Sequence, residues 1–93
     1  MDGSSRVHAV VRGDVQGVGF RYFIADFARD RGLVGWVRNR PDGGVECVAE
    51  GPRRALEELV ARLRRGPSSA EVSDVETEWT EARGDLAGFQ IRG

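Results

Sequence analysis

Three glycines within seven residues, Gly13, Gly17 and Gly19, constrain this chain most, because they separate two incompatible patterns. Before them, residues 7–11 are rich in β-branched side chains and predict a strand. After them, apolar side chains recur at positions 20, 23, 24, 27 and 28, which is typical of a helix. Glycine permits positive φ, so the intervening loop can turn several N–H groups towards one point at the start of that helix. A loop of this kind is suited to binding phosphate.

The rest of the chain continues to alternate between strand and helix patterns. Residues 33–39 and 45–50 predict two strands joined by the turn sequence Pro41-Asp42-Gly43-Gly44. A second amphipathic helix follows Pro52 and stops at Gly66-Pro67, and two more strands are expected at 72–79 and 89–91. The order β-α-β-β-α-β plus a C-terminal strand predicts an α+β fold, a ferredoxin-like two-layer sandwich. In it, two helices cover one face of an antiparallel sheet.

Length and composition indicate a single domain. We expect this domain to span residues 1–93, with residues 1–5 forming a disordered N-terminal extension, and we expect a monomer. No apolar run approaches the length of a membrane span, and the first five residues are not signal-like. We therefore expect a cytoplasmic protein with no membrane partner. The one cysteine, Cys47, cannot form an internal disulfide and is interpreted as a small core residue.

The charged residues argue against several classes of partner. The formal net charge is −1, and residues 71–85 carry six acidic side chains against one arginine, so we expect no nucleic-acid partner. No histidine, cysteine or carboxylate cluster has metal-ligand spacing, so the expected site holds no metal and no cofactor. His8, the one histidine, lies in the first predicted strand and is interpreted as structural or solvent-facing.

Two separated motifs resemble the signatures of the acylphosphatases, small enzymes that hydrolyse carboxyl–phosphate mixed anhydrides. The first motif is Val11-Arg12-Gly13-Asp14-Val15-Gln16-Gly17-Val18-Gly19-Phe20-Arg21, followed by Tyr22 and Phe23. The second is Gly35-Trp36-Val37-Arg38-Asn39-Arg40, followed by Gly43 and Gly44. Glu50-Gly51-Pro52 and Gly66-Pro67-Ser68-Ser69-Ala70 match further landmarks of the family in the same order. The resemblance covers nearly the whole chain, from about residue 6 to residue 92.

The resemblance implies a role for each candidate residue and a small-molecule acyl phosphate as substrate. Arg21 would bind the phosphate, since a planar guanidinium can hold two oxygens at once. Asn39 would hold the attacking water, because an amide both donates and accepts hydrogen bonds. Position alone would instead favour an asparagine that bonds the turn backbone. The phosphate would also be held by the backbone amides of Val15, Gln16, Gly17, Val18, Gly19 and Phe20.

Two positions depart from the family pattern. Gly19 stands where some relatives carry a larger residue, which could loosen the loop. The chain ends at Gly93, where many relatives end in an aromatic residue, so a terminal contact with the active site is in doubt.

Two other functions fit parts of the pattern. RNA-recognition domains share this order of elements but stack bases on aromatic residues of their first and third strands, and residues 7–11 and 45–49 contain no Phe, Tyr or Trp. Acylphosphatase-like domains also resemble the N-terminal part of larger carbamoyl-transferring maturation proteins. The cysteine clusters expected downstream in such proteins are absent here, which favours a free-standing hydrolase. A separate partner chain remains an alternative.

Overall fold

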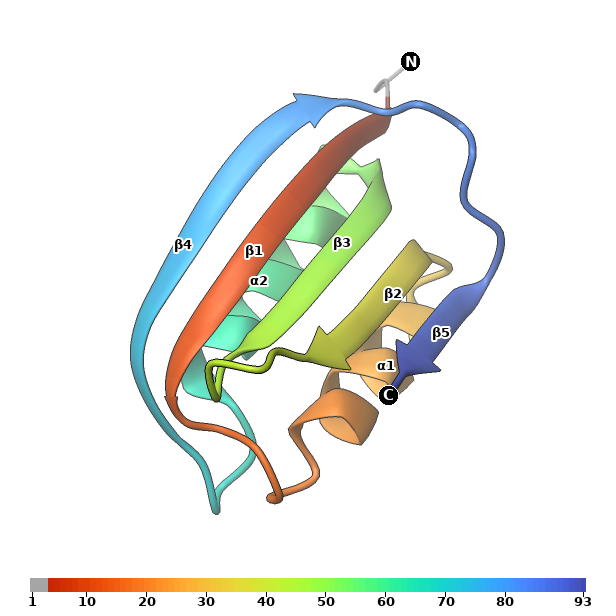
Figure 1. The fold of residues 1–93 in the computed structure, drawn as a ribbon. Helices are drawn as coiled ribbons and strands as arrows, with labels where there is room; N and C mark the ends of the chain where they lie inside the picture. The colour runs from red at the N-terminus through yellow and green to blue at the C-terminus, as the bar shows by residue number, and fades with distance from the viewer. Residues whose placement is uncertain (1–3) are drawn as a thin grey trace.

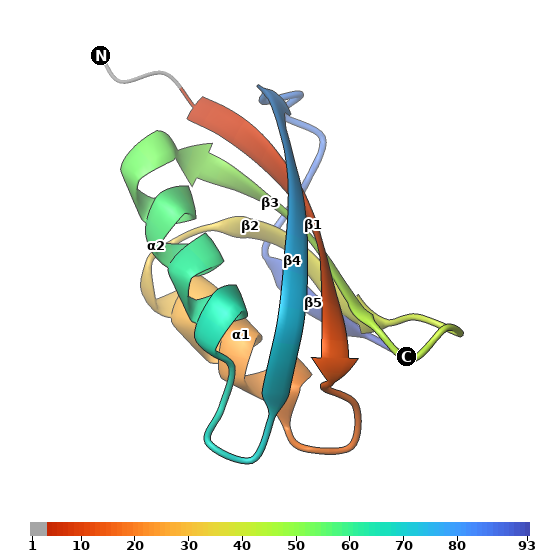
Figure 2. The ribbon, with the colours of Figure 1, turned by 90° about the vertical axis from the view of Figure 1, so that its left-hand side faces the viewer.

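Two helices pack against one face of a five-stranded sheet, and the opposite face is open (Figure 1, Figure 2). The structure is a computed structural model, and it describes residues 4–93. Along the chain the elements are β1 (Ser4–Asp14), α1 (Phe20–Asp30), β2 (Val34–Asn39), β3 (Val45–Pro52), α2 (Arg53–Arg65), β4 (Glu71–Glu81) and β5 (Phe89–Arg92). The expected α+β, ferredoxin-like sandwich is confirmed.

The sheet is mixed, whereas an antiparallel sheet was expected. Its strand order is β4-β1-β3-β2-β5, and β3 pairs antiparallel with both β1 and β2. β5, however, runs parallel to β2. The reason is the path of the chain after β4, which ends at the same end of the sheet where β2 begins. The connection crosses at that end to the far edge, so β5 must start beside the start of β2 and run in its direction (Figure 1).

β1 is longer than the sequence predicts at both ends. Ser4 and Ser5 pair with Pro52 and Gly51 of β3, so the expected disordered extension is wrong for these two residues. Residues 1–3 of that extension lie outside the described residues. At its other end β1 continues to Asp14 through a register shift against β4. Strand pairing on both sides therefore orders polar residues whose side chains carry no strand signal.

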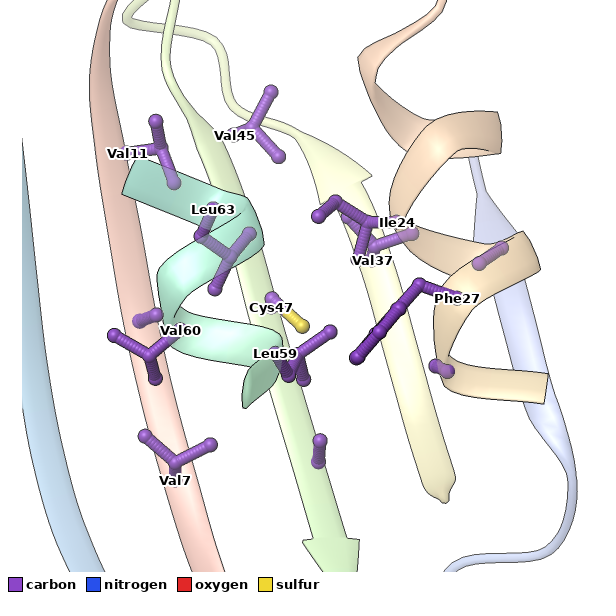
Figure 3. Close-up of a cluster of buried hydrophobic side chains, with 14 of the residues drawn as sticks. Val7, Val11, Ile24, Phe27, Val37, Val45, Cys47, Leu59, Val60 and Leu63 are labelled. Atoms are coloured by element: carbon purple, nitrogen blue, oxygen red, sulfur yellow. The ribbon is translucent and has the colours of Figure 1, made fainter. Parts of the chain in front are cut away.

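The hydrophobic core lies between the helices and the sheet (Figure 3). Its fully buried side chains include Val7 and Val11 of β1, Cys47 of β3, Ile24 of α1 and Leu59 of α2. Burying one large apolar side chain stabilises a fold by about 1.5–3 kcal/mol. Cys47 is 0% exposed, and burial raises its pKa to about 12, which confirms its interpretation as a core residue.

Glu50 lies on the open face of β3 but is a buried charged residue, since it is only 4% exposed. Its carboxylate accepts hydrogen bonds from Arg6 Nη1 at 2.6 Å and from the backbone N–H groups of Arg83 at 3.0 Å and Gly84 at 3.1 Å. Burial raises the pKa of Glu50, but these hydrogen bonds outweigh burial and hold the pKa below its usual value. The carboxylate thus joins β3 to β1 and to the β4–β5 connection.

This network predicts a specific acid sensitivity. A depressed folded-state pKa contributes stability that is present above the unfolded pKa, about 4.3 for glutamate, and is lost as pH falls through the folded value. We expect Glu50→Gln to flatten the decline in the free energy of unfolding below that pH. Urea titrations between neutral and strongly acidic pH measure it, with Glu81→Gln on the exposed edge of β4 as the control. Equal acid slopes for wild type and Glu50→Gln would contradict the assignment.

Candidate functional site

The topology brings the C-terminal ends of three strands, β1, β2 and β5, to the same end of the sheet. This end is called the site edge below. β1 and β2 are both antiparallel to β3 and therefore share a direction, and β5 is parallel to β2. The glycine loop follows β1, Asn39 ends β2, and Arg92 ends β5. α1 begins at this edge directly after the loop (Figure 1). All residues that the sequence predicts for the site therefore lie at one end of the molecule.

The loop of residues 15–19 leaves its backbone donors free. Gly17 and Gly19 have φ angles of 77° and 78°, a left-handed conformation that favours glycine. No added Cβ at either position would meet an atom within 4 Å, so conformation rather than space requires glycine there. Among the turn and loop hydrogen bonds between backbone groups of residues 4–93, none is donated by an amide of residues 15–19. Gly17 and Gly19 are exposed and Gln16 and Val18 are half-buried, so these amides can donate to an anion that arrives from solvent.

The start of α1 adds to this positive potential. Gly19 is the N-cap residue and supplies no side-chain cap, and the first turn contains no acidic residue. The positive end of the helix dipole is therefore not compensated by the chain itself. The first helical hydrogen bond runs from Phe23 N–H to Gly19 O at 3.0 Å, which leaves the earlier helical amides pointing out of the helix end.

Arg21 lies in that first turn and is half-buried. Its Nη1 donates to the backbone carbonyl of Arg92, at the end of β5, at 2.7 Å. A guanidinium carries five N–H donors, so this bond uses one edge of the group and orients the rest. This backbone acceptor for Arg21 is supplied by β5, the C-terminal strand.

Asn39 is the last residue of β2 and pairs with Val45 of β3. Because side chains alternate along a strand, Asn39 points to the same face as the buried Val37, which is the face covered by the helices. The residue before it, Arg38, pairs with Arg92, whose carbonyl is the acceptor for Arg21. Asn39 and the Arg21 guanidinium therefore both lie near the end of β5.

Two side chains that sequence reasoning did not single out support the loop. The Gln16 side-chain amide donates to Arg40 O at 2.7 Å and to Gly44 O at 2.8 Å, both in the β2–β3 turn. Ser69, in the α2–β4 turn, donates from its hydroxyl to Val18 O at 3.3 Å. Their partners are main-chain carbonyls, which have no sequence signature, so only the family resemblance at these positions could have pointed to them.

A cavity at the same end of the sheet does not suit phosphate. This cavity of about 530 Å³ beside the end of β1 is lined by Gly13, Asp14, Glu71, Val72 and Ser73, and its two carboxylates disfavour phosphate. Within residues 4–93, no three His, Cys, Asp or Glu side chains lie close enough to hold a metal ion. No helix in this part of the chain has the length and apolar character needed to cross a membrane.

His8 belongs to the open face of the sheet, where charged side chains pair with one another. Its Nε2 lies 2.6 Å from Glu46 Oε2, and Arg38 Nε donates to Glu46 Oε1 at 2.7 Å. Burial raises the pKa of Glu46, while the bonds from His8 and Arg38 lower it below its usual value. His8 therefore serves the packing of the open face.

Known proteins with this sequence pattern share the architecture. The acylphosphatase family model matches residues 7–91. An acylphosphatase of Trichormus variabilis is 53% identical over 87 residues, which cover 94% of this chain and 85% of the relative. The crystal structure of acylphosphatase from Bacillus subtilis superimposes with a TM-score of 0.91 at 39% identity, covering 96% of this chain and 99% of that one.

The same architecture also occurs within a larger protein. HypF of T. kodakarensis is 31% identical with a TM-score of 0.80, and the match covers 96% of this chain but only 12% of HypF. The match over residues 7–91 and the identity of about one half to a curated relative settle the classification. This chain belongs to the acylphosphatase family of enzymes.

Proposed function

We propose that this protein hydrolyses the carboxyl–phosphate bond of small acyl phosphates, releasing a carboxylate and inorganic phosphate. Membership of the acylphosphatase family supports this reaction class. One observation supports the proposal for these particular residues: the groups lie at the same end of the sheet. The loop amides have no backbone partner there, Arg21 bonds to the end of β5, and Asn39 ends the neighbouring strand.

The phosphate would be held by the loop and Arg21 together. The amides of residues 15–20 would donate to its oxygens, and the uncapped start of α1 favours negative charge there. The Arg21 guanidinium would donate to a further pair of oxygens with the edge that Arg92 O does not occupy. These donors are fixed before substrate arrives, so they stabilise the charge that spreads over the equatorial oxygens without reorganising.

Asn39 would hold the attacking water. Water attacks phosphorus in line with the bond to the acyl oxygen, so one P–O bond forms as the other breaks. The electron pair of the broken bond leaves with the carboxylate, which is a good leaving group. One proton of the water passes to a phosphate oxygen, so no protein general base is required. An amide is sufficient for this task, because it orients water without being a strong base.

The open face of the sheet does not favour the alternative of an RNA-binding module. Register places Arg6, His8 and Val10 of β1 opposite Glu50, Val48 and Glu46 of β3 on this face. None of these is Phe, Tyr or Trp, and the one ring, that of His8, is held by the Glu46 carboxylate, whereas RNA-recognition domains stack bases on aromatic residues of the corresponding strands. Trp36, on the open face of β2, is covered by the Arg92 guanidinium at 4.6 Å.

The direct test is release of phosphate from benzoyl phosphate with divalent metal removed by a chelator. We expect turnover at a rate that does not change when magnesium is restored, since the proposed donors are all protein groups. Phosphate release is followed against the spontaneous hydrolysis of the same compound without protein. Substrate loss no faster than this blank would overturn the proposed function.

Arg21→Ala is expected to lower kcat/KM by at least ~100-fold, on the scale of losing one oxyanion-stabilising donor. The matched control is Arg29→Ala, because Arg29 also extends from α1 to a β5 carbonyl, with Nε and Nη2 at 3.0 and 2.8 Å from Phe89 O. That variant loses a comparable link between α1 and β5 at the other end of the helix and should keep its activity. Equal losses in both variants would make Arg21 a structural residue.

Asn39→Ala is expected to reduce turnover to a small residual rate while inorganic phosphate still competes for the site, because the loop and Arg21 stay in place. The measurement pairs steady-state kinetics with a phosphate titration followed by amide chemical shifts of residues 15–20. If phosphate binding disappears together with turnover, Asn39 belongs to the phosphate cradle or supports the fold, and a different group holds the water.

A further inference from the structure

We infer that Gln16 is a positioning residue that sets the placement of Asn39 relative to the phosphate-binding loop. The inference rests on the proposed function and assigns to the Gln16 side chain a task distinct from that of its backbone amide. Its basis is the pair of bonds from Gln16 Nε2 to Arg40 O at 2.7 Å and to Gly44 O at 2.8 Å. Both hydrogens of the side-chain amide are thereby used across the β2–β3 turn.

These two acceptors flank the turn immediately after Asn39. Arg40 is the next residue along the chain, and Arg40 N–H donates to Gly44 O at 2.8 Å, closing the turn one step beyond the Asn39–Val45 pair. Gln16 therefore bonds to both ends of the turn, at the residue after β2 and at the residue before β3. A shift of the loop relative to the hairpin must break at least one of these bonds.

The turn is rigid enough to transmit this placement. Asp42 Oδ1 accepts from Gly44 N–H at 3.0 Å, and Asp42 also accepts from Arg40 Nε at 3.1 Å. The hydrogen bond from Arg40, with that from Gly44, lowers the pKa of Asp42 to about 2, and the two bonds hold its carboxylate across the turn. The hairpin end is therefore a fixed body to which the loop is attached.

The loop has a second support that does not involve Asn39. Ser69 donates to Val18 O from the α2–β4 turn, on the other side of the loop. The two supports differ in what they connect. Ser69 connects the phosphate loop to the α2–β4 turn, whereas Gln16 connects it to the turn directly after the proposed water-holding residue. Among residues 4–93, the side-chain hydrogen bonds between loop residues 15–19 and the β2–β3 turn are those of Gln16.

Loss of this connection should impair the chemical step more than phosphate binding. In-line attack requires the water and phosphorus to be aligned, and a misplacement of about 1 Å can cost on the order of 100-fold in rate. The loop amides and Arg21 would still surround the phosphate, because the loop conformation comes from Gly17 and Gly19 and from the start of α1.

The test uses Gln16→Met, which keeps the length of the side chain and removes both donors without adding charge, with Ser69→Ala as the matched control. We expect Gln16→Met to lower kcat for benzoyl phosphate by about 10- to 100-fold. The inhibition constant of inorganic phosphate should change by less than about threefold, because the donors to phosphate remain. Ser69→Ala should leave both constants near wild type.

A double-mutant cycle separates positioning from general support. In the Gln16→Met background, Asn39→Ala should cost at least ~10-fold less than it does in wild type, because the water is already misplaced. Arg21→Ala should cost the same factor in both backgrounds. Independent, multiplicative effects of Gln16→Met and Asn39→Ala, or a loss of phosphate affinity as large as the loss of kcat, would overturn the inference.

Two controls keep the result interpretable. If Gln16→Met does not fold, as judged by its urea unfolding curve, Gln16→Asn keeps the amide but is too short to reach both carbonyls and takes its place in the cycle. If wild type itself does not hydrolyse benzoyl phosphate, the proposed function fails. The link is then tested by hydrogen exchange of the Arg40 and Gly43 amides, which should quicken in the variant and not in Ser69→Ala; unchanged exchange would overturn it.

Discussion

Burial of one face of the sheet is the constraint on which the rest of the structure depends. Two helices can cover the sheet only if apolar side chains alternate in step along neighbouring strands, as they do for Val7, Val11 and Cys47. This alternation fixes the register of β1, β3 and β2, because a slip of one residue would expose the core face. Register in turn decides which residues stand at the ends of the strands. The position of Asn39 is therefore a consequence of core packing.

The proposed site is assembled from main-chain groups more than from reactive side chains. Loop amides, a helix end, and carbonyls that orient Arg21 and Gln16 provide most of its geometry. Such a site needs no side chain with a strongly shifted pKa, because phosphoryl transfer from an acyl phosphate depends on positioning and on electrostatic stabilisation. It can therefore be built on a small domain whose main requirement is that three strand ends stay in register.

Much of this arrangement can be predicted from the sequence, and the exceptions have physical causes. The helical spacing after Gly19 and the β-branched run before Gly13 are local patterns, so both elements and the loop between them are predictable. The direction of β5 is not, since it depends on which end of the sheet the preceding connection crosses. The same holds for Ser4 and Ser5, which are ordered only by pairing with β3.

The proposed site also has parts that the sequence predicts and parts that it does not. Arg21 and Asn39 stand out because their motifs resemble those of a known family, while the bond that orients Arg21 is made to a carbonyl of Arg92 in β5. The role of the Gln16 side chain is hidden for the same reason, since it bonds to main-chain oxygens more than twenty residues away. Contacts to the backbone leave no trace in the identity of the partner residue.

Because Cys47 is buried between the helices and the sheet, its reaction with a thiol reagent reports how often these layers separate. The thiol is the only one in the sequence, lies on the central strand, and has a pKa of about 12, so the reactive thiolate is scarce while the protein is folded. Alkylating reagents reach it only when the helices separate from the sheet. The rate at which a reagent modifies this protein therefore measures how often the native packing breaks, without any engineered label.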